Sequence, residues 1–264
     1  MKIITLNTHS LLEENQDTKL MHLADFIENN RPSLIALQEV NQTSSLEHVE
    51  NTEVCKAIGK IPLKSDNYAF RLSKLLKSKG IQYNCIWYGF KNSYGRFDEG
   101  LAIFSRNSLK EVTNMLLTDT ANYFNFKKRM ALIAETDTGV FVNCHLGWED
   151  DGEEEYNKQI ARLISCNNFK KDVFLMGDFN ITPDSNSYET IMSSGFYDTF
   201  SLAEKKIGEV TVSGKIDGWE KNTQDKRIDY IFANKKIPVK ESRVVFSGKS
   251  HPVISDHFGV MISF

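Results

Sequence analysis

An apolar run from Val173 to Met176 is followed by Gly177, Asp178 and Asn180. In an extended strand, side chains two residues apart point to the same face, so Asp178 and Asn180 are expected to project together. The glycine allows a turn or a close backbone approach, and 182–184 (Thr-Pro-Asp) ends the strand before a helical stretch. This strand end is therefore either a plain turn cap or part of a reactive site.

Polar residues also end six other apolar, β-branched or aromatic runs, which are spread over the whole chain. These segments are Thr5–Asn7, Gln38–Val40, Glu99–Leu101, Asn143–Leu146, Arg227–Tyr230 and Ser255–Phe258. Loops and strand ends at the edge of a sheet are where a rigid scaffold presents reactive side chains. Seven such segments predict one shared pocket.

Hydrophobic periodicity predicts strands with helices between them. Helical spacing occurs in 17–30, 67–79, 156–164 and 184–194. Strands are expected at 2–7, 34–37, 83–90, 99–105, 110–117, 126–135, 140–145, 227–233, 243–246 and 258–264. Residues 43–66 are expected to form a loop with a short helix around 53–58, and 92–98 a second loop. This mixture fits an α/β (α+β) fold with two sheets face to face and helices outside.

Composition limits the organisation and the partners of the chain. Its 264 residues, 41% of them hydrophobic, can bury a substantial core, and no linker or repeat divides them, so one domain spanning 1–264 is expected. The formal net charge is −3, and basic residues cluster only at 127–129 and 235–236. A duplex DNA binder usually carries a basic surplus, so nucleic acid is not an expected partner.

The cysteines and the apolar runs bear on location. Cys55, Cys85, Cys144 and Cys166 form no C-x-x-C pair, and buried free thiols fit a reducing compartment. The N-terminal apolar stretch is too short for a signal-peptide core, and no run reaches transmembrane length. A cytoplasmic monomer that does not bind membranes is expected.

The polar residue types suit phosphoester hydrolysis. That reaction needs the phosphate charge screened, a water aimed in line and activated, and a leaving oxygen stabilised. Mg²⁺ is held by hard oxygen ligands, commonly one or two carboxylates. Glu39 and Asp256, with the carboxamide of Asn7, fit that requirement, although each alone also fits a solvated loop residue. The acidic run 149–155 precedes a predicted helix, where carboxylates favour the helix dipole, and is not expected to bind metal.

Taken together and in this order, the seven segments resemble the endonuclease/exonuclease/phosphatase superfamily, which is deoxyribonuclease-like. The resemblance covers essentially the whole chain. It implies a four-layer α-β-β-α sandwich of two packed mixed sheets, with the site at one end of the sheets. It also implies a metal-dependent phosphoric ester hydrolase, with Mg²⁺ as the cofactor and Mn²⁺ as an alternative.

The resemblance also implies roles for individual residues. Glu39 matches the principal metal ligand, with Asn7 and Asp256 beside it. His257 matches an imidazole oriented by Asp229, and His145 matches a second imidazole paired with Glu99. We expect His257 to activate the water that Asp178 helps to hold, although sequence leaves open which of the two takes the proton. His145 and Asn180 are expected to stabilise the phosphorane or the leaving oxygen.

The substrate class rests on finer features. Abasic-site endonucleases carry Tyr where this chain has His145, which disfavours a repair nuclease. The segments 6–10, 38–42, 98–100, 145–148 and 216–219 look like a bacterial subgroup that includes the maltose 6'-phosphate phosphatases, which implies a small phosphorylated sugar as substrate. Candidate substrate contacts are His9, Arg129, Trp148 and Trp219. The alternatives are a supporting role for His9, a surface basic cluster for Arg129, and tryptophans that only cap a core residue, Trp87.

Two other functions compete with this prediction. The first is a phosphodiesterase of the nuclease or sphingomyelinase type. A bacterial sphingomyelinase would need export and an exposed aromatic hairpin for docking, and neither is evident in the sequence. The second is a binding module with a degenerate site, which is disfavoured because every expected metal and imidazole position holds a competent residue.

Overall fold

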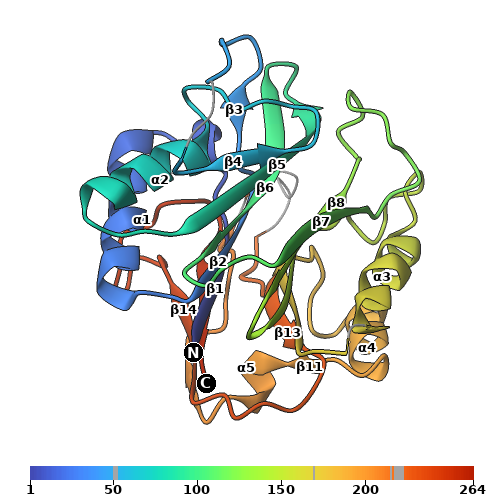
Figure 1. Ribbon diagram of the computed structural model, residues 1–264. Helices are drawn as coiled ribbons and strands as arrows, with labels where there is room; N and C mark the ends of the chain where they lie inside the picture. Colours follow the sequence, from blue (N-terminus) through green and yellow to red (C-terminus); the bar gives the residue numbers. More distant parts are fainter. Residues whose placement is uncertain (50–52, 169, 215, 217–222) are drawn as a thin grey trace.

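Two mixed β-sheets pack face to face in the middle of the protein, and helices cover the outer face of each (Figure 1). This computed structural model describes residues 1–49, 53–168, 170–214, 216 and 223–264. The arrangement confirms the predicted α-β-β-α sandwich of two mixed sheets.

The first sheet has nine strands and contains both chain ends. In spatial order its strands are β12 (Lys205–Ile207), β14 (Glu241–Val245), β15 (Gly259–Ser263), β1 (Lys2–Asn7), β2 (Leu34–Gln38), β6 (Phe97–Ser105), β5 (Asn84–Ser93) and β4 (Lys56–Ile58), with β3 (Gln42–Thr43) paired to β6. The second sheet has six strands in the order β11 (Tyr197–Asp198), β13 (Asp229–Ala233), β10 (Val173–Asp178), β9 (Gly139–His145), β8 (Met130–Thr136) and β7 (Glu111–Leu116).

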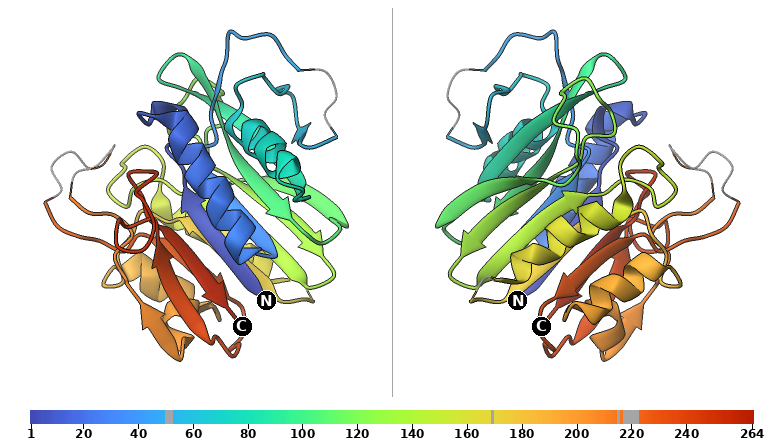
Figure 2. Two further views of the ribbon diagram at one scale, coloured as in Figure 1. Left: turned by 90° about the vertical axis from the view of Figure 1, so that its left-hand side faces the viewer. Right: turned by 90° about the vertical axis from the view of Figure 1, so that its right-hand side faces the viewer.

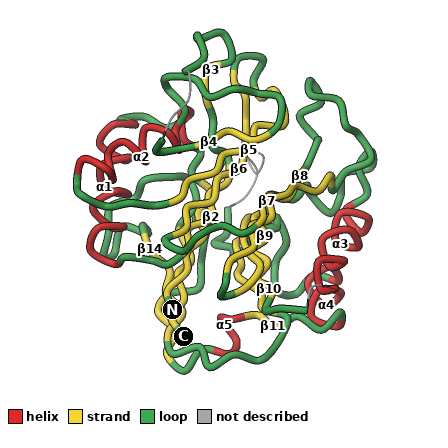
Figure 3. The backbone as a smooth tube through the Cα atoms, viewed as in Figure 1, coloured by secondary structure: helices red, strands yellow, loops and turns green. Residues whose placement is uncertain are grey.

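Helices form the outer layers (Figures 2 and 3). The first sheet is covered by α1 (Gln16–Asn30) and α2 (Tyr68–Ser78), and the second by α3 (Tyr156–Ile164) and α4 (Asn186–Ser193). Shorter turns are η1 (Ser10–Leu12), η2 (Ser165–Asn168) and α5 (Thr199–Leu202). Apolar side chains form one core between the sheets and one beneath each helical layer, as expected when a sheet is buried on both faces.

Two local predictions were wrong. The helix expected around 53–58 is instead the strand β4, which pairs in parallel with the edge of β5 and satisfies its backbone there. The loop expected at 92–98 is mostly strand, because the β5–β6 pairing continues through Ser93 and Phe97 and leaves only a tight turn. Both errors arise from pairing with a distant or neighbouring strand, which local periodicity does not record.

The strand predicted for 126–135 begins later, at Met130. The side chains of Asn122 and Asn125 accept hydrogen bonds from the backbone N–H groups of Phe124 and Lys127, at 3.0 Å each. Such local bonds stabilise turns in competition with a strand. Residues 117–129 therefore form a long connection between β7 and β8.

The topology gathers the polar strand ends at the end of the sandwich away from the termini (Figure 1). In the first sheet β1 and β2 run in parallel, with Asn7 opposite Gln38. In the second sheet β9 and β10 run in parallel, with His145 opposite Asp178, and Asp229 lies opposite Asp178 on the other side. The sites that the sequence places at strand ends are therefore neighbours.

Trp87 is a core residue. Its side chain is fully buried, and its Nε1 donates a 2.9 Å hydrogen bond to the carbonyl of Val40. The indole occupies the space above two glycines of the β5–β6 pair. A Cβ at Gly89 would lie 2.4 Å from the ring, and a Cβ at Gly100 would lie 2.5 Å from both Nε1 and the carbonyl oxygen of Tyr88.

We therefore expect Gly100→Ala to lower the free energy of unfolding by about 1–3 kcal/mol, because the added methyl group overpacks a rigid part of the core. Urea unfolding followed by circular dichroism measures this change. Gly152→Ala is the matched control, since a Cβ there meets nothing within 4 Å. Equal stability of Gly100→Ala and the wild type would contradict the packing described for Trp87.

Candidate active site

A cavity of about 530 Å³ opens where the strand ends of the two sheets meet. Eight of the residues predicted from the sequence line it: Glu39, Glu99, Arg129, His145, Trp148, Asp178, Asn180 and His257. Its remaining walls come from the β5–β6 hairpin and the 117–129 connection, through Lys91, Asn92, Ser93, Tyr94, Gly95, Phe124 and Phe126. The cavity has the size of a small-molecule site.

His257 lies between two carboxylates, as predicted for the imidazole oriented by Asp229. Its Nδ1 is 2.9 Å from Asp229 Oδ2, and its Nε2 is 3.7 Å from Asp178 Oδ2. Burial alone would lower the pKa of His257, but the two carboxylates raise it well above its usual value. Burial, reinforced by Asp229 and opposed by His257, raises the pKa of Asp178 to about 7. His257 and Asp178 are therefore a closely coupled proton-holding pair.

Asn7 joins the carboxylates that come from the two sheets. Its Nδ2 donates to Glu39 Oε1 at 2.8 Å and to Asp178 Oδ2 at 3.1 Å, while its Oδ1 accepts from the backbone N–H of His9. In this structure Asn7 is thus a hydrogen-bond donor between two carboxylates. Its predicted role as an oxygen ligand to metal stays a prediction.

The carboxylates fit a divalent cation. Burial, together with the nearby charges of Glu99 and Asp256, raises the pKa of Glu39 to about 7. Glu39 also has a φ of 50°, in the left-handed region that non-glycine residues rarely adopt. A bound cation would offset the repulsion among these carboxylates, and hard oxygen donors of this kind suit Mg²⁺ or Mn²⁺.

Asp256 lies slightly outside the cavity, in a cluster with His9 and Glu13 whose ligand atoms are all within 4.8 Å of one another. His9 Nδ1 is 2.8 Å from Glu13 Oε1 and 3.8 Å from Asp256 Oδ1. Burial lowers the pKa of His9, but the hydrogen bond that His9 donates to Glu13 and the charge of Asp256 outweigh it and raise the pKa to about 9. His9 therefore contacts a predicted metal ligand and does not line the cavity.

The predicted pair of His145 with Glu99 is not formed. Glu99 Oε1 lies 3.0 Å from Lys91 Nζ, because Lys91 is the cross-strand neighbour of Glu99 in the β5–β6 hairpin. His145 instead has its Nε2 3.5 Å from Asp178 Oδ2, and its Nδ1 has no hydrogen-bond partner in the described part of the chain. Burial, then the charges of Arg129 and Lys91, lowers the pKa of His145 well below its usual value.

Asn180 is held in place by the loop after β10. Its backbone N–H donates to Asp178 Oδ1 and its Nδ2 donates to the carbonyl of Leu146, both at 3.0 Å, and its φ is 52°. This left-handed conformation turns the chain immediately after Asp178. The carboxamide consequently lies on the cavity wall near His145, where the sequence placed it.

The remaining predicted substrate contacts have different outcomes. Arg129 is buried on the cavity wall, with its guanidinium carbon 5.3 Å from the centre of the Trp148 ring. Trp148 lines the cavity, and its buried Nε1 has no hydrogen-bond partner among the described residues. Trp219 lies outside the described residues.

Sequence reasoning missed four residues at or near the site. Lys91, Phe124 and Phe126 line the cavity. Glu13 contacts His9, and it does not lie at the end of a predicted strand. The four-residue spacing of His9 and Glu13 is a weak local hint of their contact. For the other three the only hint is that 92–98 and 117–129 flank the motif residues Glu99 and Arg129 in sequence.

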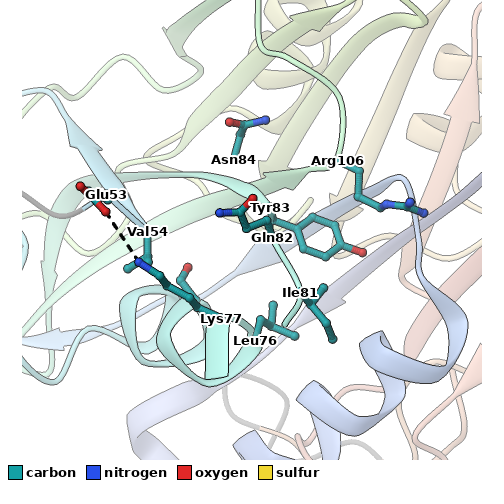
Figure 4. Close-up of a pocket in the computed structure, with 10 residues that line it drawn as sticks. Glu53, Val54, Leu76, Lys77, Ile81, Gln82, Tyr83, Asn84 and Arg106 are labelled. Atoms are coloured by element: carbon teal, nitrogen blue, oxygen red, sulfur yellow. Dashed lines mark ion pairs between the residues drawn. The ribbon is translucent and has the colours of Figure 1, made fainter. Parts of the chain in front are cut away.

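A second cavity, of about 290 Å³, lies between α2 and the start of β5 (Figure 4). Lys77 and Glu53 form a 3.6 Å ion pair there, beside Tyr83, Asn84 and Arg106. Its lining contains neither a histidine nor a pair of carboxylates. The catalytic residue types are therefore concentrated in the cavity at the strand ends.

Comparison with known families agrees with this geometry. Residues 4–257 match the model of the Endonuclease/Exonuclease/phosphatase family. The chain belongs to this family. It is accordingly a phosphoester hydrolase, and enzymes of the family generally depend on divalent metal. No curated protein sequence matches the chain.

Solved structures extend the comparison. An endonuclease/exonuclease/phosphatase family protein from Leptotrichia buccalis C-1013-b is 31% identical, with a TM-score of 0.86 over 100% of this chain and 98% of that one. A mannosyl-6-phosphatase from Bacteroides thetaiotaomicron VPI-5482 is 16% identical, with a TM-score of 0.71 over 100% and 98%. A 3' phosphatase from Neisseria, bound to a product DNA hairpin, is 18% identical, with a TM-score of 0.65 over 100% and 99%. The last two share the fold.

The described residues contain no helix that is both long and apolar enough to cross a lipid bilayer.

The two imidazoles of the site should titrate at different pH values, because the pKa of His257 is raised and that of His145 is lowered. At pH 6.5, the ordinary imidazole value, we expect His257 to be protonated and His145 to be neutral in the metal-free protein. The folded-state pKa of His257 lies above its unfolded value, so its contribution to stability is fully present below about pH 6.5 and is lost as pH rises through the folded pKa. Asp229→Asn should therefore reduce the free energy of unfolding most at the acidic end.

Nitrogen-15 NMR of the imidazoles, with and without Asp229→Asn, measures both titrations. Titration of His145 and His257 at one common pH would contradict the electrostatic arrangement described for the site.

Proposed function

We propose that this phosphoester hydrolase is a Mg²⁺-dependent phosphomonoesterase that acts on a phosphorylated sugar of the maltose 6'-phosphate type. The observation that carries the proposal is the aromatic mouth of the catalytic cavity. Tyr94, Phe124, Phe126 and Trp148 line it, and Phe124 is 78% exposed. Exposed aromatic rings beside catalytic groups suit a ligand that has an apolar face and a polar edge, as a sugar has.

The charge around this mouth supports a compact substrate. Lys127, the basic residue next to Phe126, is paired with Asp151 at 2.8 Å and with Glu153 at 3.2 Å. The neighbouring surface hollow is lined by Glu149, Asp150 and Asp151. A polyanion such as DNA would meet these carboxylates, whereas a neutral sugar ring would not be repelled.

The chemistry divides between the carboxylates and the imidazoles. Glu39 and Asp256 would hold the cation, which when bound screens phosphate charge and acidifies water. Asn7 keeps Glu39 and Asp178 in a fixed relation. Asp178 and His257, the latter held by Asp229, position the attacking water and take its proton as a coupled pair. His145 and Asn180, on the adjacent wall, donate to the phosphoryl or leaving oxygen in an in-line displacement.

We further infer that the enzyme is a cytoplasmic monomer that binds a small phosphorylated sugar and neither nucleic acid nor membrane. The four cysteines are buried as thiols, which suits a reducing compartment. The mannosyl-6-phosphatase of the same fold supports this substrate class by analogy alone.

A phosphodiesterase is the second candidate, and one observation favours it. The sequence showed no exposed aromatic hairpin, but the structure places Tyr94, 55% exposed, in the β5–β6 turn, with Phe124 and Phe126 also exposed. The expectation that the protein lacks an exposed aromatic hairpin was therefore wrong. The exposure of Tyr94 depends on how far the β5–β6 pairing extends, which the sequence does not show. These rings could contact a base or a lipid instead of a sugar.

The direct test measures phosphate release by the purified protein with Mg²⁺. Substrates are maltose 6'-phosphate, other sugar monophosphates, a synthetic diester and plasmid DNA. We expect release from a phosphorylated sugar, loss of activity with a chelator and its return with added Mg²⁺, and a loss of about 10²- to 10⁴-fold in His257→Ala. Cleavage of only the diester or DNA would overturn the substrate assignment.

The aromatic mouth can be tested separately. Phe126→Ala and Trp148→Ala should each raise KM for the sugar phosphate about 3- to 10-fold with a smaller change in kcat, because stacking binds substrate and transition state alike. Val253→Ala removes an exposed apolar side chain away from the cavity lining and is the matched control. Unchanged KM in both aromatic variants would remove the argument for sugar stacking.

A further inference from the structure

The catalytic cavity contains two buried cationic side chains on its wall, Lys91 and Arg129, which we call the cation pair. Lys91 is 4% exposed and Arg129 is 2% exposed. They come from different sheets, Lys91 from β5 and Arg129 from the residue before β8. Two cations on the wall of one cavity repel each other, so the arrangement implies an anion that binds both.

Arg129 has no charge partner in the part of the chain that the structure describes. No carboxylate among the residues that the structure describes forms an ion pair with it, and its buried Nε has no hydrogen-bond partner. The guanidinium group packs against the Trp148 ring, whose centre lies 5.3 Å from the guanidinium carbon. Burying an uncompensated charge is unfavourable, so Arg129 is stabilised fully only when an anion occupies the cavity.

Lys91 is aimed at the cavity by an irregularity in its strand. The β5–β6 register shifts between Gly89 and Lys91, which is a β-bulge, and bulges redirect side chains. Lys91 Nζ lies 3.0 Å from Glu99 Oε1 and donates to the carbonyl of Phe126 at 3.0 Å. An ammonium group has three N–H donors, so these contacts leave one for a ligand.

The charges of this wall do not balance. Glu99 offsets Lys91, and the buried Arg129 is left over. A phosphomonoester carries close to two negative charges above its second pKa of about 6 and has three non-bridging oxygens. A diester carries one charge, and its second ester group replaces one of those oxygens.

We propose that Lys91 and Arg129 bind the non-bridging oxygens of a dianionic phosphoryl group and thereby make a phosphomonoester, not a diester, the preferred substrate. This inference rests on the proposed phosphomonoesterase function and names the residues that select for it. Glu99 is a positioning residue in this arrangement, since it holds Lys91. Guanidinium and ammonium groups are the side chains that bind phosphate oxygens most strongly.

The 117–129 connection fixes the distance between the two cations. The carbonyl of Phe126 accepts from Lys91 Nζ, and the carbonyl of Tyr123 accepts from the backbone N–H of Asn92 at 2.8 Å. Tyr123 also donates from its hydroxyl to Asp98. The connection from the second sheet is thereby attached to the hairpin of the first, directly before Arg129.

The experiment compares kcat/KM for p-nitrophenyl phosphate and methyl p-nitrophenyl phosphate, a monoester and a diester with the same leaving group, in the Mg²⁺-loaded enzyme. We expect Arg129→Gln and Lys91→Gln each to lower kcat/KM for the monoester by about 100-fold and for the diester by less than about 10-fold. Lys128→Gln removes the charge next in sequence to Arg129 but outside the cavity lining, and should leave the ratio unchanged.

The unfolding temperature of the Arg129 variant distinguishes an anion-binding role of Arg129 from a structural one. If Arg129 is retained for anion binding, Arg129→Gln should unfold at the same temperature as the wild type or higher, and added inorganic phosphate should raise the unfolding temperature of the wild type more than that of the variant. An unchanged monoester-to-diester ratio in both variants, or destabilisation of Arg129→Gln with equal phosphate effects, would overturn the inference.

These outcomes differ from a failure of the proposed function. A wild type that hydrolyses p-nitrophenyl phosphate with the expected variant ratios, but no sugar phosphate, would leave the cation pair intact and overturn the sugar assignment. If the wild type hydrolyses sugar phosphates while both variants keep the wild-type monoester-to-diester ratio, the sugar assignment stands and the role of the cation pair is overturned.

Discussion

A hydrogen-bonded bridge between the two sheets sets the geometry on which the site depends. Asn143 of β9 donates from Nδ2 to the carbonyls of Leu37 and Ala102, at 2.9 Å each, and its Oδ1 accepts from Gln38 Nε2 at 2.6 Å. Every atom of the bridge is buried, where satisfied polar groups specify one arrangement of their surroundings. Because Gln38 precedes Glu39 and Asn143 lies two residues before His145, the bridge fixes the two halves of the site relative to each other.

A second constraint acts within the second sheet. Gly177 has a φ of 146°, and a Cβ on it would lie 1.8 Å from the carbonyl oxygen of Cys144. No other residue type permits this approach of β10 to β9. It brings Asp178 beside His145, while the antiparallel pairing with β13 brings Asp229 to the other side. The cavity that results has carboxylates on one wall and the cation pair on another, complementary to a metal ion and a phosphoryl group respectively.

The sequence was most informative where a carboxylate or histidine directly follows an apolar run. Asp178, His145 and Glu39 could be located in this way, because a strand end is a local pattern and parallel strands end together. Lys91 could not, since a bulge directs it and its partner Glu99 lies across a hairpin. Phe124 and Phe126 lie in a connection held by Asn-capped turns and by contacts with the other sheet. The partner of Glu99 was mistaken for the same reason: cross-strand register is not visible in local spacing.

We infer that the two sheets jointly form one site for a divalent metal and a phosphoryl group. The most direct measurement is anomalous diffraction from crystals that contain Mn²⁺ and orthovanadate. We expect a Mn²⁺ peak at Glu39, and vanadate between the His257–Asp178 pair and the two cations. Vanadate bound elsewhere, or a Mn²⁺ ion confined to the His9–Glu13–Asp256 cluster with none at Glu39, would contradict a site shared by the two sheets.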